Sequence, residues 1–212
     1  MKNKRNILLV EGRNDLHVIS NLCKSRNIPK AFEIEACNSK DGTIIHFDLC
    51  INEESTRYDS VGIVVDADFE IAGTWDKIKD KIKRSERYHN VPEELNPEGL
   101  TLEPILKNSP SIGVWVMPNN IKEGVLEDFV SLLANEEDEL MYEAEQVLSS
   151  LEERRIQKYK EVHRAKAKIY TYLAWQDEPG KPMGQAITSK ILNPNSDKAD
   201  GFIGWLKLLF IK

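Results

Sequence analysis

The sequence predicts an α/β fold, in which a parallel β-sheet is covered by helices on both faces. Three short apolar runs, residues 7–10, 61–65 and 112–117, have the length and continuous hydrophobicity of strands that are buried on both sides. Segments with apolar residues at helical spacing separate these runs. Alternation of strands and helices along a chain is typical of a parallel sheet. The 212 residues, 41% of them hydrophobic, suffice for one well-packed domain.

Each element of the sheet region is predicted from its local pattern. After the first strand, Asn14 or Asp15 can cap a helix whose apolar residues recur at helical spacing as far as Cys23. The further elements are, in order, a strand over 31–36, a turn at Asp41-Gly42, a helix over 43–51, the strand over 61–65, a helix over 73–88, a proline-containing excursion over 89–102, the strand over 112–117, a turn over 118–120 and a helix over 124–133.

From residue 136 the pattern changes to charged segments with helical periodicity. Helices are predicted over 136–160, 162–175 and 201–210, with a loop over 177–184. We therefore expect an α/β core over residues 1–135 and a helical extension over residues 136–212 that packs on it.

The charge of the chain is unevenly distributed. The net charge of −6 argues against a protein that coats nucleic acid without specificity. Residues 151–212 nevertheless carry 12 Lys and Arg against 7 Asp and Glu, and residues 1–150 carry 17 against 28. An acidic metal-holding core with a basic, phosphate-facing attachment would give this distribution, and so would two ordinary solvated surfaces.

No segment is long and apolar enough to suggest contact with a membrane, and the cysteines suggest a cytoplasmic protein. No apolar run approaches the length that crosses a bilayer. Cys23, Cys37 and Cys50 are odd in number and lack the spacing of a metal site, so we expect reduced thiols and a cytoplasmic location.

Acidic residues follow three of the predicted strands. They are Glu11, with Asp15 four residues later; Asp66 and Asp68, with Glu70 two residues further on; and Glu127 with Asp128. Ligands of open parallel sheets bind beyond the carboxyl ends of the strands, so we expect these acids at one edge. Grouped carboxylates repel one another, and Mg²⁺ or Mn²⁺, which prefer oxygen ligands, would relieve that repulsion.

Each acid also has a simpler explanation. Asp15 can serve as a helix cap, the Asp66–Asp68 pair can form a turn, and Glu127 can favour the dipole of a helix start. Acids at three independent strand ends are harder to explain in this way, which favours a metal site.

Several other motifs for phosphate, metal or nucleophilic chemistry are excluded. The chain has no GxxxxGK[ST] loop and no GxGxxG after a strand. An EF-hand is excluded because Ile71 stands where its glycine belongs and Lys77 where its closing glutamate belongs. No signature of a Ser-His-Asp or Cys-His nucleophile is present.

Two segments, VEGRND over 10–15 and VVDADFE over 64–70, resemble a Toprim domain, the catalytic module of topoisomerases, bacterial primases and OLD nucleases. The resemblance covers about residues 6–132 and implies a Rossmann-like parallel sheet between helices. It implies the following roles: Glu11 as general acid or base and metal ligand, Asp66 and Asp68 as the metal-binding pair, Glu70 as a third acid, and Asp15 as the additional acid of two-metal OLD-type nucleases.

The tail carries a narrower resemblance. Residues 163–187 are similar to the C-terminal signature of small stand-alone Toprim proteins of uncharacterised function. OLD-type nucleases also use a lysine supplied after the Toprim core, and Lys166 and Lys168 are the candidates here. Two residues apart on a helix, they point to different faces, so we expect only one of them to reach the site. Both could equally be solvated residues of an amphipathic helix.

We therefore expect a divalent-metal-dependent phosphodiester hydrolase that cuts DNA or RNA with two Mg²⁺ or Mn²⁺ ions, with mobile-element defence as a role by analogy with OLD-type systems. The absence of a primase zinc-binding domain and of an ATPase domain argues against primase and topoisomerase activity. One alternative is a small-molecule phosphohydrolase, since DADFE partly matches the DxDx[TV] motif of haloacid-dehalogenase-type phosphatases, with Glu70 replacing Thr or Val. Another is a non-catalytic binding or regulatory module that works with a partner protein such as an ATPase.

Overall fold

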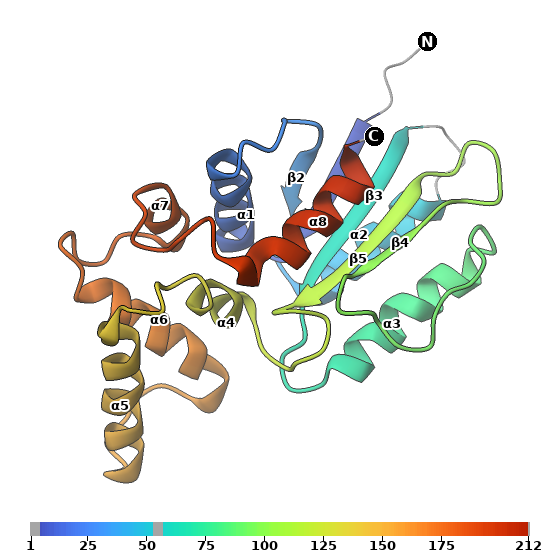
Figure 1. Ribbon diagram of the computed structural model, residues 1–212. Helices are drawn as coiled ribbons and strands as arrows, with labels where there is room; N and C mark the ends of the chain where they lie inside the picture. Colours follow the sequence, from blue (N-terminus) through green and yellow to red (C-terminus); the bar gives the residue numbers. More distant parts are fainter. Residues whose placement is uncertain (1–4, 53–56, 212) are drawn as a thin grey trace.

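The computed structural model, which describes residues 5–52 and 57–211, contains a five-stranded sheet between two layers of helices (Figure 1). The strands are β1 (Arg5–Val10), β2 (Glu33–Ala36), β3 (Tyr58–Asp66), β4 (Leu100–Leu102) and β5 (Ser111–Met117), in the spatial order β2-β1-β3-β5-β4. The pairs β2-β1, β1-β3 and β3-β5 are parallel, and β4 is antiparallel to β5. The predicted α/β fold is confirmed, and it is consistent with a Rossmann-like fold.

Two helices cover each face of the sheet. Helices α2 (Lys40–Asn52) and α3 (Ile71–Arg84) lie on one face, and α1 (Arg13–Ser25) and α8 (Asp200–Phe210) lie on the other. Successive strand residues point to opposite faces. In β1, Leu8 therefore packs with the α1 and α8 layer, and Leu9 packs with the α2 and α3 layer. Because both faces are covered, the central strands are apolar at nearly every position.

Helix α8 lies directly on the centre of the sheet, although it comes from the end of the chain. Gly62 of β3 and Gly113 of β5 are neighbours in the sheet and lie beneath it. A Cβ atom added to Gly113 would lie 2.5 Å from Leu209 Cδ2 and 3.0 Å from Trp205 Cζ2. The absence of side chains at these two positions thus allows α8 to approach β3 and β5 closely. The extension predicted over residues 136–212 therefore contains a helix that covers the sheet.

The other helices lie outside these two layers, three of them beside the carboxyl edge of the sheet and α7 (Met183–Thr188) against α1. They are α4 (Leu126–Ser131), α5 (Glu139–Glu153), α6 (Arg164–Ala174) and α7, with 3₁₀ turns at Glu161–His163 and Asp197–Ala199. Helices α5 and α6 pack side by side and project away from the sheet, beyond α4 (Figure 1). The longest helix, α5, has 15 residues, and no helix in the described ranges is long and apolar enough to cross a membrane.

Several predicted boundaries were wrong for local reasons. The turn predicted at Asp41-Gly42 lies inside the first turn of α2, because the Ser39 hydroxyl accepts a hydrogen bond from the Gly42 amide and starts the helix earlier. The predicted helix over 136–160 begins at residue 139 and ends at residue 153. The excursion over 89–102 ends in β4, and the loop over 177–184 runs into α7.

Candidate functional site

Four carboxylates line one hollow at the carboxyl edge of the sheet. They are Glu11, Asp15, Asp66 and Glu127, which we call the carboxylate cluster. The hollow has a volume of about 430 Å³ and is otherwise lined by the loop after β1, the loop after β2 and the start of α4. The edge predicted from the strand ends therefore does bring together acids from separate segments of the chain.

Glu11 lies at the end of β1 and reaches across to the neighbouring strand. Its Oε1 accepts a hydrogen bond from the backbone N–H of Asp66, at 2.8 Å. Burial raises the pKa of Glu11 to about 7, against the opposing effects of this hydrogen bond and of the positive charge of Lys40. At neutral pH, the Glu11 carboxyl is thus poised between its protonated and ionised forms.

Asp15 is buried, with 7% of its surface exposed, and it lies in the first turn of α1. Its Oδ2 accepts a hydrogen bond from the Gly12 amide at 3.1 Å. The prediction that Asn14 or Asp15 occupies the cap position was wrong, because Gly12 is the cap and Asp15 supports it from within the helix. Burial also raises the pKa of Asp15 to about 6.

Asp66 lies at the centre of the cluster. Its Oδ1 accepts a hydrogen bond from the Leu126 amide at 2.8 Å, which joins the end of β3 to the start of α4. Burial, together with the smaller effects of the charges of Glu11, Asp15, Glu127 and Asp68, raises the pKa of Asp66 to about 9. Because Asp66 interacts with four other carboxyl groups, a cation bound beside it would reduce the repulsion among all five.

Glu127 interacts electrostatically with Lys166, which belongs to the tail of the chain. Glu127 lies in the first turn of α4, and burial raises its pKa, whereas the charge of Lys166 in α6 lowers it. Lys166 is exposed, and its Nζ lies 6.0 Å from the centre of the Tyr170 ring. Of the two candidate lysines, Lys166 is therefore the one that acts on the cluster.

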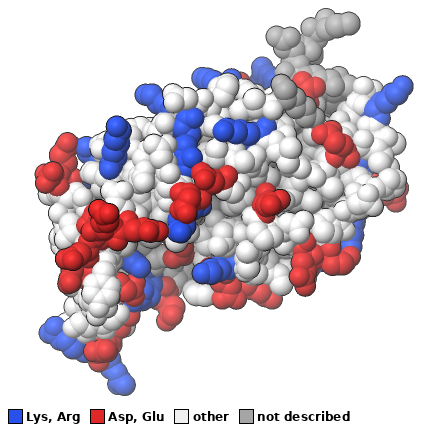
Figure 2. Space-filling model, in the orientation of Figure 1, with Lys and Arg blue, Asp and Glu red and all other residues white. Residues whose placement is uncertain are grey.

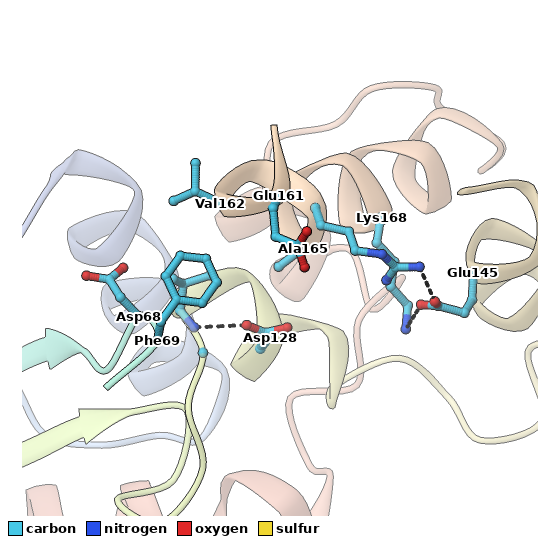
Figure 3. A pocket seen from close by; sticks show the side chains of 11 residues that line it. Asp68, Phe69, Asp128, Glu145, Glu161, Val162, Ala165 and Lys168 are labelled. Carbon is cyan, nitrogen blue, oxygen red and sulfur yellow. Dashed lines mark hydrogen bonds and ion pairs between the residues drawn. The ribbon is translucent and has the colours of Figure 1, made fainter. Parts of the chain in front are cut away.

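Lys168 is engaged elsewhere. Its Nζ forms an ion pair with Glu145 Oε2 at 2.8 Å, and the same carboxylate binds Arg164 (Figure 3). These partners lower the pKa of Glu145 to about 2, with Arg164 contributing most. Lys168 thus takes part in an ion-pair network that joins α5 to α6.

Asp68 lies beside the cluster and lines a second hollow, of about 230 Å³, together with the exposed Phe69 (Figure 3). Its backbone has a φ of +54°, and it exchanges two hydrogen bonds with Gly124, at 2.9 and 2.8 Å. Asp is among the residues that adopt this left-handed conformation more readily than most, and the bridge to Gly124 holds the backbone there.

Glu70 is not brought to the cluster. It is exposed, and its carboxyl folds over the first turn of α3, 3.0 Å from the position that a Cβ would take at Gly73. The spacing of DADFE suggested a third acid of the site, but the chain turns into α3 at this residue.

The sequence pattern did not identify Lys40, which forms an ion pair with Asp68. Lys40 begins α2, and its Nζ lies 2.5 Å from Asp68 Oδ2. The available signal was its position, four residues after a strand that runs parallel to β1, since loops at that position reach the same edge of the sheet.

The donors of the cluster suit a hard divalent cation, because every side chain contributes carboxylate oxygen. Within residues 5–52 and 57–211, no three His, Cys, Asp or Glu side chains form a group that could hold a metal ion as they stand. Glu11, Asp15 and Asp66 each direct one oxygen to a backbone amide. Coordination would therefore use their second oxygens or a rotation of these side chains.

The molecular surface carries both signs of charge. On the face drawn in Figure 2, Lys and Arg are scattered among Asp and Glu, and the described residues there form no continuous basic area. On this face, a nucleic acid would thus find local positive charges rather than one broad basic surface.

The comparisons with known proteins place the chain in a family. A family model described as "Protein of unknown function (DUF3226)" matches residues 5–211, which is nearly the whole chain. No curated protein and no solved structure matches it.

Proposed function

The chain belongs to the DUF3226 family of proteins of unknown function, and we propose that it is a divalent-metal-dependent phosphodiester hydrolase that cuts DNA or RNA. The observation that carries the proposal is the position of Asp66. Its partly buried carboxyl interacts with Glu11 and Asp15 from the β1–α1 segment, with Glu127 of α4 and with Asp68 of its own loop. Gathering mutually repelling carboxylates at one edge of the sheet destabilises the fold, and such groups are typical of functional sites.

The residues of the cluster would hold Mg²⁺ or Mn²⁺ through carboxylate oxygens. When bound, such an ion would polarise a phosphate and lower the pKa of water at the site. Glu11, which follows β1 and contacts the Asp66 amide, is the carboxylate of this site that would exchange a proton with water or substrate. Lys166 can stabilise negative charge on phosphate oxygens, since its ammonium group already acts on Glu127 at the rim of the cluster.

The test is cleavage of plasmid DNA, single-stranded DNA and transfer RNA in Mg²⁺, in Mn²⁺ and in EDTA. We expect cleavage that requires the metal and that Asp66→Asn abolishes. The matched control is Asp177→Asn, which changes an exposed aspartate outside the cluster and should cut at the wild-type rate. Equal cleavage by Asp66→Asn and the wild-type protein would overturn the proposal.

The same experiment separates the two alternatives. Turnover of small phosphate esters with an acid-labile aspartyl-phosphate on Asp66, and no cleavage of nucleic acid, would support a phosphohydrolase. A folded protein that binds neither Mn²⁺ nor nucleic acid would support a non-catalytic module that works with a partner protein.

A further inference from the structure

Lys40 is a partly buried cation within a group of acids. Its side chain is 17% exposed, its Nζ lies 2.5 Å from Asp68 Oδ2, and the Thr74 hydroxyl is 3.4 Å away. The charge of Lys40 also acts on Glu11, whose pKa it lowers. The ammonium group therefore interacts with two carboxylates: it pairs directly with Asp68, in the loop after β3, and acts electrostatically on Glu11, at the end of β1.

Asp68 is directed to Lys40 and not into the hollow of the carboxylate cluster. The hollow lined by Glu11, Asp15, Asp66 and Glu127 does not include Asp68, which lines the neighbouring hollow with Phe69. The two hydrogen bonds to Gly124 hold the backbone of Asp68, and the ion pair with Lys40 holds its carboxylate. The acids thus divide into a group of four around one hollow and a single aspartate that already has a cationic partner.

We propose that the site holds one divalent ion on the carboxylate cluster, and that the Lys40 ammonium supplies the second positive charge, at Asp68. The inference rests on the proposed function and deepens it, since the resemblance to OLD-type nucleases implies two ions. A second ion at Asp68 would have to displace an ammonium group that lies in direct contact with the carboxylate. An ammonium supplies its charge without needing a filled coordination shell of oxygens.

An ordinary ion pair between a helix start and a loop is the competing explanation. The chain offers a control for it, because Lys81 of α3 forms a similar pair with Asp48 of α2, at 2.8 Å and away from the cluster. Removing Lys81 removes a lysine and an ion pair but leaves the acids of the site unchanged. Lys40→Arg provides a second control, since it keeps the positive charge beside Asp68.

The experiment counts Mn²⁺ ions bound per full-length chain, by electron paramagnetic resonance of the free ion and by calorimetry. Ions at the site are those that Asp66→Asn removes, and thermal unfolding of each variant verifies that it is folded. We expect one such ion in the wild-type protein, in Lys40→Arg and in Lys81→Gln. We expect two in Lys40→Gln, because Asp68 then lacks its cation, and one again in Lys40→Gln combined with Asp68→Asn.

Each contrary result identifies what has failed. Two ions in the wild-type protein, or one ion in a folded Lys40→Gln chain, would overturn the role of Lys40 and leave the proposed hydrolase standing. No ion in the wild-type protein would overturn both proposals.

Discussion

The carboxylate of Glu11, at the end of β1, accepts a hydrogen bond from the backbone amide of Asp66, at the end of β3. The side chain of Asp66 in turn accepts a hydrogen bond from the Leu126 amide, at the start of α4. This chain of contacts connects the ends of two parallel strands to the following helix. The cluster is thus organised by backbone amides before any ion is present, and an arriving ion would meet oxygens that are partly oriented.

Replacing Asp66 by Asn should make the metal-free protein more stable at neutral and alkaline pH. The pKa values of Asp66, Glu11 and Asp15 are raised to about 9, 7 and 6 in the folded protein. A carboxyl whose folded pKa is raised contributes stability below its unfolded pKa, near 4, and loses it as the pH rises through the folded value. Stability in EDTA should therefore fall between about pH 4 and about pH 9.

Thermal unfolding in EDTA at several pH values tests this prediction. The asparagine that replaces Asp66 can still accept the hydrogen bond from the Leu126 amide through its side-chain oxygen, but it carries no charge beside the other acids. We expect Asp66→Asn to flatten the pH dependence and to raise Tm by several degrees at about pH 8, where about 1 kcal/mol corresponds to about 2–4 °C. Mn²⁺ should stabilise only the wild-type protein. A variant that is less stable than wild type at about pH 8 would contradict a raised pKa of Asp66, which burial and then the neighbouring acids cause.

Lys166 and Lys168 should differ in their effects on cleavage. Lys166 acts electrostatically on Glu127, whereas Lys168 is engaged by Glu145. Loss of a donor that stabilises developing charge typically costs about 100-fold in rate. We therefore expect Lys166→Met to lower kcat for nucleic acid cleavage by about that factor. Lys168→Met should retain most of the wild-type kcat. Equal losses in both variants, with unchanged melting temperatures, would show that the two lysines do not have separate roles.

The layout of the fold could be predicted because its signals are local. The strands at residues 7–10, 61–65 and 112–117 are short apolar runs, and their burial on both faces follows from continuous hydrophobicity. Strand β4 has three residues, too few to show a period. The position of α8 depends on Gly62 and Gly113, whose significance appears only when the two strands lie side by side.

The candidate site could be predicted only in part. Glu11 and Asp66 end apolar strands, and the topology of a parallel sheet brings such ends to one edge. For Lys40 the signal was weaker, because its position after β2 indicates the same edge of the sheet but nothing in its local sequence indicates the pairing with Asp68. Glu70 had the expected spacing, but the start of α3 carries it away from the cluster.

Tyr172 should contribute measurably to the packing of the helices beyond the core. Its hydroxyl donates a hydrogen bond to Asp138 Oδ2 at 2.8 Å, and Asp138 also caps α5 by accepting from the Leu140 amide. A hydrogen bond to a charged group is worth about 1.5–3 kcal/mol. Tyr172→Phe should lower the free energy of unfolding in urea by about that amount, whereas Tyr142→Phe, at an exposed position of α5, should change it little. Equal stability of the two variants would contradict a structural role for this bond.

Adding one methyl group at Gly113 should destabilise the protein, whereas adding one at Gly204 should not. A Cβ at Gly113 would lie 2.5 Å from Leu209 Cδ2 and 3.0 Å from the Trp205 ring, and the indole is itself fixed by a hydrogen bond from its Nε1 to the Leu100 carbonyl. Relief of the clash therefore requires α8 to move off the sheet, and overpacking of this kind costs about 1–3 kcal/mol.

Gly204 is the matched control, because it lies in α8 itself and a Cβ there meets nothing within 4 Å. Replacing an unhindered helical glycine by alanine stabilises a helix by about 0.5–1 kcal/mol, since alanine has less backbone entropy to lose. The free energy of unfolding in urea should thus fall for Gly113→Ala and rise for Gly204→Ala. If Gly113→Ala were as stable as the wild-type protein, α8 would not be packed as closely on β3 and β5 as the structure shows.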